Sequence, residues 1–543
     1  MAEARARIYG NMLPIFEALQ RAEARLSFEQ IGAAVVDWKM PVNSIEDCLQ
    51  ALCNTGLVIR ICGRDEDPSW CIPQEVLPLL EYCESPSGGT QSPLALFGWL
   101  HRYLSTKVPR ASVDAAAQNM FQMLGTAASI ESRLQSLEAW QLSAVQNIVS
   151  EFGGMISKEL FGKEYPDLNL FELDKALEKA SLGSVMELNL EPFGLRHNAP
   201  TLVIVHEAVI FVLEHQKEIS DKQIIQKVSV GTDFVANFSR FANYLEKGSL
   251  RFTTKGAIYK TTGKRLAAEL LMPDSREFTK FEILELEFQF ARDTRLLINS
   301  AEQKFILSEE GLRFLRNDML EKQRLMLDWM VEEYSLRGDM SHQVRMRRSA
   351  LRFLRLLKPK KWYDAMHLPY IVRNHHFSLL TSGQVSPLQN GSFPLRASSD
   401  ARELCWNLLL WMRKDLHLLG LIDLGYDAND KLIAMRLTSV GCEILGLLDL
   451  EEKRQTGHII VNPDFEIVLF PLLASHRLIY TLDSICDRER TDSLYHFRIS
   501  QQSVKRALSI GFSHDEILQV LSENSPTPLP QNVCYELRSW TNA

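Results

Sequence analysis

The chain has 543 residues, several times more than one hydrophobic core requires, and at ~150 residues per domain this suggests about three to four domains. Apolar residues make up 46% and charged residues 24%, which excludes a wholly disordered, collagen-like or silk-like protein. With 60 Lys and Arg against 68 Asp and Glu, the net charge is −8, so any site for a polyanion such as nucleic acid must be local.

The sequence predicts a reduced, cytoplasmic protein. Its first residues lack the uninterrupted apolar core of a signal peptide, and no window reaches the ~18 apolar residues of a membrane span. The nine cysteines are odd in number and contain no Cys-x-x-Cys pair, which argues against disulfides and a structural zinc. We therefore expect no membrane partner, no metal and no cofactor.

Residues 1–84 are predicted to form a winged helix. An apolar helix is followed by Ser27-Phe-Glu-Gln30, whose Ser and Gln have the spacing of a capping box and should start a second helix. A third helix follows Pro41 and ends at Gly56, after which two short strands form a hairpin. Three helices and a hairpin in this order are typical of a winged helix. The outward residues of its third helix are too acidic to favour DNA: Asp47, Gln50 and Asn54.

The next two predicted domains follow a linker rich in Ser, Pro and Gly. Residues 94–195 are mostly helical by pattern and contain no motif that we can place, so we expect a helical scaffold. Residues 196–318 are predicted to be a winged helix with an extension, whose first helix is Thr201–Leu213 and whose second begins at Ser220. Its third helix carries an apolar stripe at Phe234, Phe238, Phe241 and Leu245. The outward side chains of this helix would suit a DNA groove: Asn237, Arg240, Tyr244 and Lys247.

Residues 319–450 are predicted to hold a basic helix and a winged-helix-like module. The basic helix is expected at His342–Leu357, and the hairpin Leu421–Leu437 has Asp427-Ala-Asn-Asp430 as its turn. Thr438 should cap a closing helix. The segment between Arg373 and Arg396 is long for a winged helix and weakens this assignment.

The basic helix carries the strongest chemical signal. Eight cations and no acid lie between residues 345 and 361, although the chain as a whole is acidic. Four arginines follow the spacing i, i+3, i+7, i+10 and share one helix face, and lysines and an aromatic pair come directly after them. This pattern predicts a nucleic-acid backbone contact beside a base-stacking pair. The predicted contacts are Arg345, Arg348, Arg352, Arg355, Lys358, Lys360 and Lys361, with Trp362 and Tyr363 as the aromatic pair.

The alternative for this helix is structural. The arginines would then pair with acids such as Glu332 and Glu333 on the preceding helix, and Trp362 would belong to the core. Charge runs are usually solvated faces, so the two interpretations carry about equal weight.

Motifs of enzymes are absent from the sequence, so no catalytic residue is predicted. The nearest string to a phosphate-binding loop, between Gly256 and Gly263, has the wrong spacing and lacks the hydroxyl after its lysine. The histidines His367, His375 and His376 have no Cys or carboxylate at ligand spacing, and we expect them in loops or on the surface.

The last residues form a separate α+β pattern, expected at 456–543. Two strands flank an Asn462-Pro-Asp464 turn, a helix and a short strand Tyr495–Ile499 follow, and two helices lie on either side of Gly511. Further marks are Val504-x-Arg-Ala-Leu508 and Leu529-Pro-Gln-Asn-Val533. This segment holds seven Lys and Arg against ten Asp and Glu, so a protein partner suits it better than DNA.

These marks, in this order and spacing, resemble the domain found in the N-terminal region of XPB-type DNA-repair helicases and in bacterial helicase-associated proteins. The stretch from Gly420 to Gly446 is similar to the winged-helix segment that often precedes this domain in bacterial members. The resemblance implies an accessory region that works near DNA and partner proteins. In the helicases, separate motor domains hydrolyse ATP, and no motor motif stands in this sequence.

The fold expected overall is therefore mainly α with small β-hairpins: tandem winged-helix modules, a helical scaffold and an XPB-like C-terminal domain. The leading hypothesis is a non-enzymatic, DNA-associated accessory or regulatory protein with a helicase or nuclease as partner. The alternative is a protein-protein interaction adaptor of a repair or helicase complex that does not touch DNA, since the net charge is negative. An enzyme without a familiar motif comes third.

Overall fold

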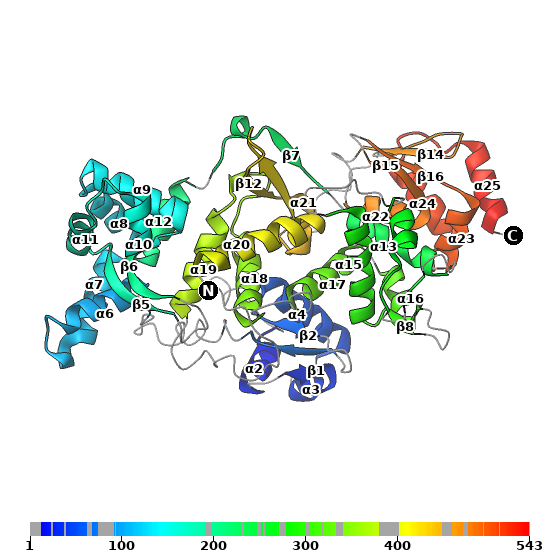
Figure 1. The fold of residues 1–543 in the computed structure, drawn as a ribbon. Coiled ribbons are helices and arrows are strands. Elements are labelled where there is room, and N and C mark those ends of the chain that lie inside the picture. The colour runs from blue at the N-terminus through cyan, green and yellow to red at the C-terminus, as the bar shows by residue number, and fades with distance from the viewer. Residues whose placement is uncertain are drawn as a thin grey trace.

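The structure is a computed structural model, and it is mainly helical with small antiparallel sheets, as predicted (Figure 1). The residues that it describes are 12–22, 25–36, 40–61, 68–73, 76, 92, 94–190, 197–216, 218–230, 233–246, 251–253, 256–268, 270, 278–299, 305–317, 319–332, 340–379, 401–447, 459–470, 476–491, 494–509 and 511–541. The molecule is elongated, with residues 94–216 at one end and the C-terminal domain at the other.

The N-terminal unit contains the predicted three helices followed by a hairpin, and it also contains a short strand after the first helix that was not predicted. Ser27 and Gln30 form the expected capping box, and Gly56 ends the third helix in the left-handed conformation with φ +70°. The first strand pairs with the last, so the sheet order is β1-β3-β2. The elements are α2 (Met12–Ala22), β1 (Leu26–Ser27), α3 (Phe28–Ala34), α4 (Val42–Thr55), β2 (Ile59–Ile61) and β3 (Ser69–Cys71).

The same order of elements recurs in residues 139–204 and 340–437. In both, a helix, a strand, two helices and a hairpin follow one another, and the first strand again pairs with the last. The earlier unit consists of α9 (Ala139–Phe152), β4 (Met155–Ser157), α10 (Lys158–Glu164), α11 (Leu170–Lys179), β5 (Gly183–Asn189) and β6 (Asn198–Ile204). The later unit consists of α18 (Met340–Leu354), β10 (Tyr363–Asp364), α19 (His367–Leu379), α20 (Ala401–Trp411), β11 (Ile422–Tyr426) and β12 (Leu432–Leu437).

Residues 233–307 follow a related order with a shorter sheet. The predicted stripe of Phe234, Phe238, Phe241 and Leu245 is buried in the first helix, which confirms that periodicity. An isolated bridge between Phe252 and Ile258 takes the place of the first strand. The elements are α13 (Asp233–Glu246), α14 (Lys260–Ala267), α15 (Lys280–Asp293), β8 (Leu297–Asn299) and β9 (Phe305–Leu307).

The segment 94–195, predicted to be a mostly helical scaffold, is mostly helical but also contains strands β4 and β5. Strands β5 and β6 pair over their whole length on either side of residue 195, and the predicted helix Thr201–Leu213 is the end of β6 followed by α12 (His206–Gln216). The buried residues 202–204, Leu-Val-Ile, form a short apolar run. Periodicity cannot assign such a short run to a helix or a strand.

A second correction concerns Ser220. Its capping box with Gln223 is present, but it closes a single 3₁₀ turn, η4 (Asp221–Gln223), and not an α-helix. The chain then forms β7 (Gln226–Val228), which pairs with the edge of β11. Residues predicted to lie in two separate domains therefore share one four-stranded sheet, β10-β12-β11-β7.

The remaining helices of the body join these units. They are α6 (Leu96–Ser105), η2 (Arg110–Ser112), α7 (Val113–Leu124), α8 (Ala127–Gln135), α16 (Glu309–Arg316), α17 (Met319–Glu332), η5 (Met412–Leu416) and α21 (Ser439–Ile444). Thr438 caps α21 as predicted. The segment 380–400, within the insertion that the sequence marks as long, lies outside the described residues.

The C-terminal domain has the predicted helices and one strand that was not predicted. Strand β15 has the sequence Asp-Arg-Glu-Arg-Thr, which shows no apolar alternation, and it occupies the edge of the sheet β13-β14-β16-β15. The elements are β13 (Ile459–Val461), β14 (Glu466–Leu469), α22 (His476–Ile485), β15 (Asp487–Thr491), β16 (Tyr495–Arg498), α23 (Gln501–Ser509), α24 (His514–Asn524) and α25 (Gln531–Thr541).

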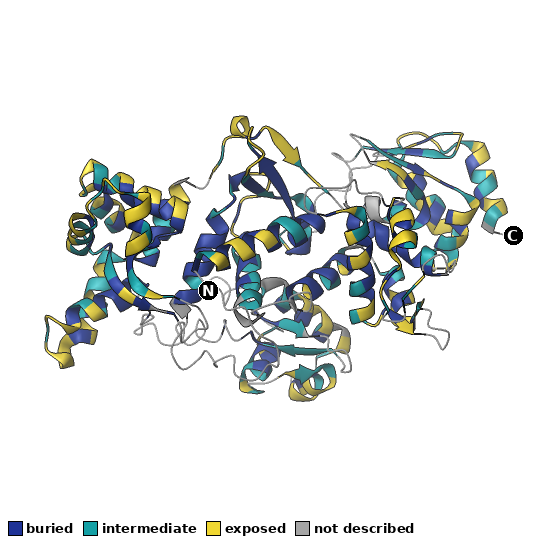
Figure 2. Ribbon diagram, in the orientation of Figure 1, coloured by how far each residue is buried: buried dark blue, intermediate teal, exposed yellow. Residues whose placement is uncertain are grey.

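One continuous hydrophobic core runs from residue 94 to residue 445, while the N-terminal unit and the C-terminal domain each have a core of their own (Figure 2). Within the continuous core, α19 is joined to the end of α9. Arg373 is fully buried and donates to the carbonyl oxygens of Phe152 at 3.0 Å and Gly153 at 2.9 Å. Asn374 donates to Gly153 as well, at 2.8 Å.

This joint predicts a pair of glycine substitutions with opposite effects. A Cβ on Gly153, whose φ is +63°, would lie 2.5 Å from the Tyr370 ring and 2.7 Å from Arg373. Gly153→Ala should therefore destabilise the body by about 2–4 kcal/mol, from backbone strain and overpacking. Gly162→Ala meets no atom within 4 Å in helix α10 and should stabilise it by about 0.5–1 kcal/mol. Thermal unfolding of both variants measures the difference, and equal midpoints would contradict this account of the joint.

Asp415 predicts a pH dependence of stability. It is buried in the π turn η5, and burial raises its pKa from 3.8 to about 7, although Arg347 and Lys414 oppose this shift. The folded state therefore retains a proton that the unfolded state loses, so stability falls as the pH rises toward and through 7. Asp415→Asn should weaken this fall between pH 5 and 8. Asp167→Asn, in an exposed loop, should behave like the unchanged protein, and identical pH profiles for both variants would refute the prediction.

Candidate functional site

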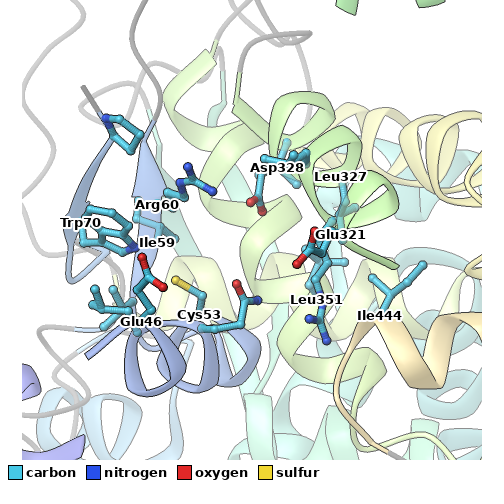
Figure 3. Close-up of a pocket in the computed structure, with 18 of the residues that line it drawn as sticks. Glu46, Cys53, Ile59, Arg60, Trp70, Glu321, Leu327, Asp328, Leu351 and Ile444 are labelled. Atoms are coloured by element: carbon cyan, nitrogen blue, oxygen red, sulfur yellow. The ribbon is translucent and has the colours of Figure 1, made fainter. Parts of the chain in front are cut away.

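The arginine face of α18 is turned toward the N-terminal unit and not toward solvent. Arg348, Arg352 and Arg355 line a cleft of about 810 Å³. The other wall of this cleft is formed by α3, α4 and the β2–β3 hairpin, which carries Arg60 and Trp70 (Figure 3). Arg345, the first of the predicted row, is not among the residues that line it. The predicted shared face thus exists in part, but it faces another part of the chain.

Arg352 joins the two walls directly. It donates to the carbonyl oxygen of Gly56 at 2.9 Å and to the hydroxyl of Ser349 at 3.1 Å. Gly56 is the C-cap of α4, where free carbonyl groups and the helix dipole favour a cation. A Cβ on Gly56 would come within 3.0 Å of the Arg352 side chain, so the contact is close. Arg352 therefore already contacts protein groups, which the prediction of a nucleic-acid contact did not include.

The other arginines of this run are also in contact with protein groups. Arg347 donates to the carbonyl oxygens of Met330 and Val331 at 3.2 and 3.4 Å, and its guanidinium lies 5.4 Å from the centre of the Trp411 ring. Burial, and then the neighbouring guanidinium groups of Arg352 and Arg324, lower the pKa of Arg355 to about 10. The proposed partners Glu332 and Glu333 have no described side chains.

The predicted base-stacking pair belongs to the core. Trp362 is 4% and Tyr363 1% exposed, so neither ring is available to a base, and the structural alternative holds for both. The adjoining Lys358, Lys360 and Lys361 are exposed. Lys361 forms an ion pair with Glu218 at 2.7 Å, and this hydrogen bond raises the pKa of its ammonium group.

Among the described residues of the predicted groove-reading helix, α13, none of those predicted to contact DNA is fully exposed, and Tyr244 is half-buried. Asn237 is fully buried, and Arg240 donates to the backbone oxygen of Arg488 in the C-terminal domain at 2.5 Å. Lys247 lies outside the described residues. The spacing itself indicates burial, because Asn237 is three residues after Phe234 and four before Phe241 and so lies on the same helix face as the apolar stripe.

The equivalent third helices of the other units show no cationic row. On α4 the exposed side chains include Glu46, Asp47 and Gln50, which line the cleft. On α11 acids and lysines alternate, and Lys175 lies over the ring of Phe171. On α20 the exposed residues are Glu403, Trp406, Asn407 and Leu410.

A buried cluster that sequence reasoning missed holds the C-terminal domain to α13. Arg488, on β15, is 1% exposed and pairs with Asp233 at the start of α13 and with Asp483 on α22. Its Nε donates to Asp483 at 2.8 Å. Burial raises the pKa of Asp233 to about 6 despite the nearby Arg488. Burial opposes the charge on Arg488, but Asp483 and Asp233 together hold its pKa above the ordinary range.

Of the histidines expected in loops or on the surface, His367 and His376 are buried in α19 and His375 is half-buried there. Desolvation lowers the pKa of His375 to about 3. In the described part of the chain, no group of three or more His, Cys, Asp and Glu side chains is placed to hold a metal ion. Among the same residues, no helix is both long and apolar enough to cross a membrane.

The Arg488 cluster yields a prediction about docking. Arg488→Met leaves two buried carboxylates without their partner, which should cost about 3–5 kcal/mol and release the C-terminal domain from α13. Hydrogen exchange of α13 and β15 should accelerate. Arg498→Met is the matched control, because its ion pair with Glu489 is exposed and contributes about 0–1 kcal/mol. The docking role of Arg488 fails if both variants exchange at the same rate.

Comparison with known protein families identifies a match for the C-terminal domain alone. A family model described as "Helicase conserved C-terminal domain" matches residues 459–543, which are the four strands and four helices of that domain. No curated protein matches the chain. The family match supports a helicase-related domain at the C-terminus, and it does not support the narrower XPB-type N-terminal assignment.

Proposed function

We propose that this protein is a non-enzymatic accessory factor of a helicase, an adaptor that contacts protein partners and does not depend on direct DNA binding. The observation that carries the proposal is the use of the α18 arginines inside the molecule, where Arg352 bonds to the end of α4. The strongest candidate for a DNA contact thereby becomes a joint between two parts of the chain.

The repeated units support an adaptor built from winged helices. A winged helix consists of three helices and a hairpin, with a short strand after the first helix, and this order recurs at 12–71, 139–204 and 340–437. Winged helices serve both DNA and protein contacts, so the exposed side chains must decide between them. Acidic, apolar and amide groups on α4 and α20 favour protein.

The C-terminal domain supports the link to a helicase. Its family match is helicase-related, and its composition is slightly acidic, with seven Lys and Arg against ten Asp and Glu from residue 456 onward. The XPB-type affiliation is part of this proposal and rests on the residue pattern around Asn462–Asp464 and Leu529–Val533. The sequence holds no phosphate-binding loop, so the motor would come from the partner.

Direct DNA binding is the second candidate. The exposed Lys358 and Lys360, beside the ion-paired Lys361, are the observation that favours it. They form a short basic loop after α18, and three such contacts would give a salt-dependent but weak association.

A measurement of DNA binding distinguishes the protein adaptor from the DNA-binding candidate. Fluorescence anisotropy with labelled duplex and single-stranded oligonucleotides at low salt should show no saturable binding below ~10 μM, the weaker part of the non-specific range. Replacing Lys358, Lys360 and Lys361 by Ala should change nothing. Saturable binding that these substitutions weaken, with a salt slope reduced by about two to three, would favour the second candidate.

The adaptor role can be tested directly by isolating a partner protein and asking whether its sequence contains helicase motor motifs. The tagged chain, cross-linked in its own cells, should retain a protein that carries helicase motor motifs. Purified separately, that helicase should bind the chain again and change its rate of ATP hydrolysis, while the chain alone hydrolyses no ATP. ATP turnover by the chain alone, or a helicase that does not bind again, would overturn the proposal.

A further inference from the structure

The cleft between the N-terminal unit and the body has two chemically different walls. One wall consists of the hairpin and α4, with Arg60, Trp70 and Glu46, and the other consists of α17, α18 and the end of α21 (Figure 3). Its volume of about 810 Å³ lies in the range of sites that take a small organic ligand. The arginines of the second wall give the cleft its chemical character.

Three guanidinium groups crowd together on that wall. Arg324 comes from α17, Arg352 from α18 and Arg355 from the turn after it, and all three line the cleft. Arg352 and Arg324 lie close enough to disfavour the charge on Arg355. Within the described residues, Arg355 makes no hydrogen bond or ion pair that would offset this repulsion. A partly buried cluster of like charges is costly, and an anion that enters it removes the cost.

The opposite wall offers a flat surface. The Arg60 guanidinium lies 5.8 Å from the centre of the Trp70 ring, and Phe28 packs against Trp70 with ring centroids 6.1 Å apart. Trp70 is only half-buried. Guanidinium planes and indole rings are the groups on which proteins stack nucleobases.

Acids in the cleft limit the kind of anion that fits. The lining contains five arginines and also five acids: Glu29, Glu46, Asp47, Glu321 and Asp328. Three of these acids lie on α3 and α4, and the other two, Glu321 and Asp328, lie on α17 within about one turn of Arg324. A duplex needs a continuous cationic surface and would meet these carboxylates, whereas a small ligand can place its charge on the arginines alone. Three guanidinium groups also exceed the charge of one carboxylate and match a di- or polyphosphate.

We propose that this cleft binds a mononucleotide, with its phosphates on Arg324, Arg352 and Arg355 and its base against Trp70 and Arg60. The ligand would contact both walls and so strengthen the attachment of the N-terminal unit to α18. The proposal does not rest on the adaptor role, because the site is defined by the cleft and not by any partner.

Isothermal titration of the full chain tests the site. ADP and ATP should bind, inorganic pyrophosphate should bind more weakly, and adenosine without phosphate should not bind. Arg355→Ala should weaken ADP binding at least tenfold, as expected for loss of a charge-assisted contact to phosphate. Arg345→Ala, on the same helix but outside the cleft, should change it less than twofold. Trp70→Ala should weaken ADP binding and leave pyrophosphate binding unchanged.

Three outcomes would overturn the proposal. The first is no heat from ADP, ATP and pyrophosphate at millimolar concentration. The second is equal affinity in the Arg355 and Arg345 variants. The third is preferential binding of a hexaglutamate peptide, which would assign the arginines to an acidic protein segment. If Arg355→Ala does not fold, Arg355→Lys decides, because it keeps one charge but loses the two-pronged contact and should still weaken ADP binding.

Discussion

Carbonyl groups at the ends of helices need partners, and in this protein arginines from distant segments supply them. Arg373 donates to the end of α9, Arg352 to the end of α4, and Arg347 to the end of α17. Arg133 does the same at the end of α11, with its Nη1 at 2.6 Å from the oxygen of Ser181. Helix C-termini favour cations, both through free carbonyl groups and through the helix dipole. The contacts of Arg373 and Arg352 join elements more than two hundred residues apart in the chain, whereas Arg347 joins the consecutive helices α17 and α18.

This constraint accounts for much of the charge pattern without a nucleic-acid partner. Residues 342–376 hold nine lysines and arginines against one acid, although the net charge of the whole chain is −8. Most of the described guanidinium groups in this segment contact backbone oxygens, aromatic rings or neighbouring units. Backbone carbonyls carry no formal charge, so a count of acids and bases along the sequence cannot show that these cations are already used.

Local features of the fold could be predicted from the sequence, and features that depend on distant partners could not. The capping boxes at Ser27 and Ser220 and the cap at Thr438 need only a few neighbouring residues, and all three are present. The prediction of an α-helix after Ser220 was wrong, because the chain there forms strand β7. This strand pairs with β11, which lies about two hundred residues later in the chain. The apolar periodicity correctly located the buried face of α13. Asn237 lies on that same face and is buried, although it was predicted to point outward.

The candidate sites show the same limit. The arginine spacing on α18 predicted a shared face correctly in part, but which surface it meets depends on how the N-terminal unit packs. The buried Arg488 could not be found, since its strand looks like a charged loop and its partner Asp233 lies in another unit. Sequence patterns therefore identified which residues are chemically unusual, and only the packing showed whether their partner is solvent or protein.

The two outer bodies are attached to the central core by different means, and this difference bears on function. The C-terminal domain is attached through Arg488, which is buried and paired with two carboxylates, so its release would expose uncompensated charge. The N-terminal unit is attached through Arg352 beside an open cleft, in which Arg355 makes no hydrogen bond or ion pair with the residues that the structure describes. A ligand that fills this cleft can change the attachment of the N-terminal unit without disturbing the helicase-related domain.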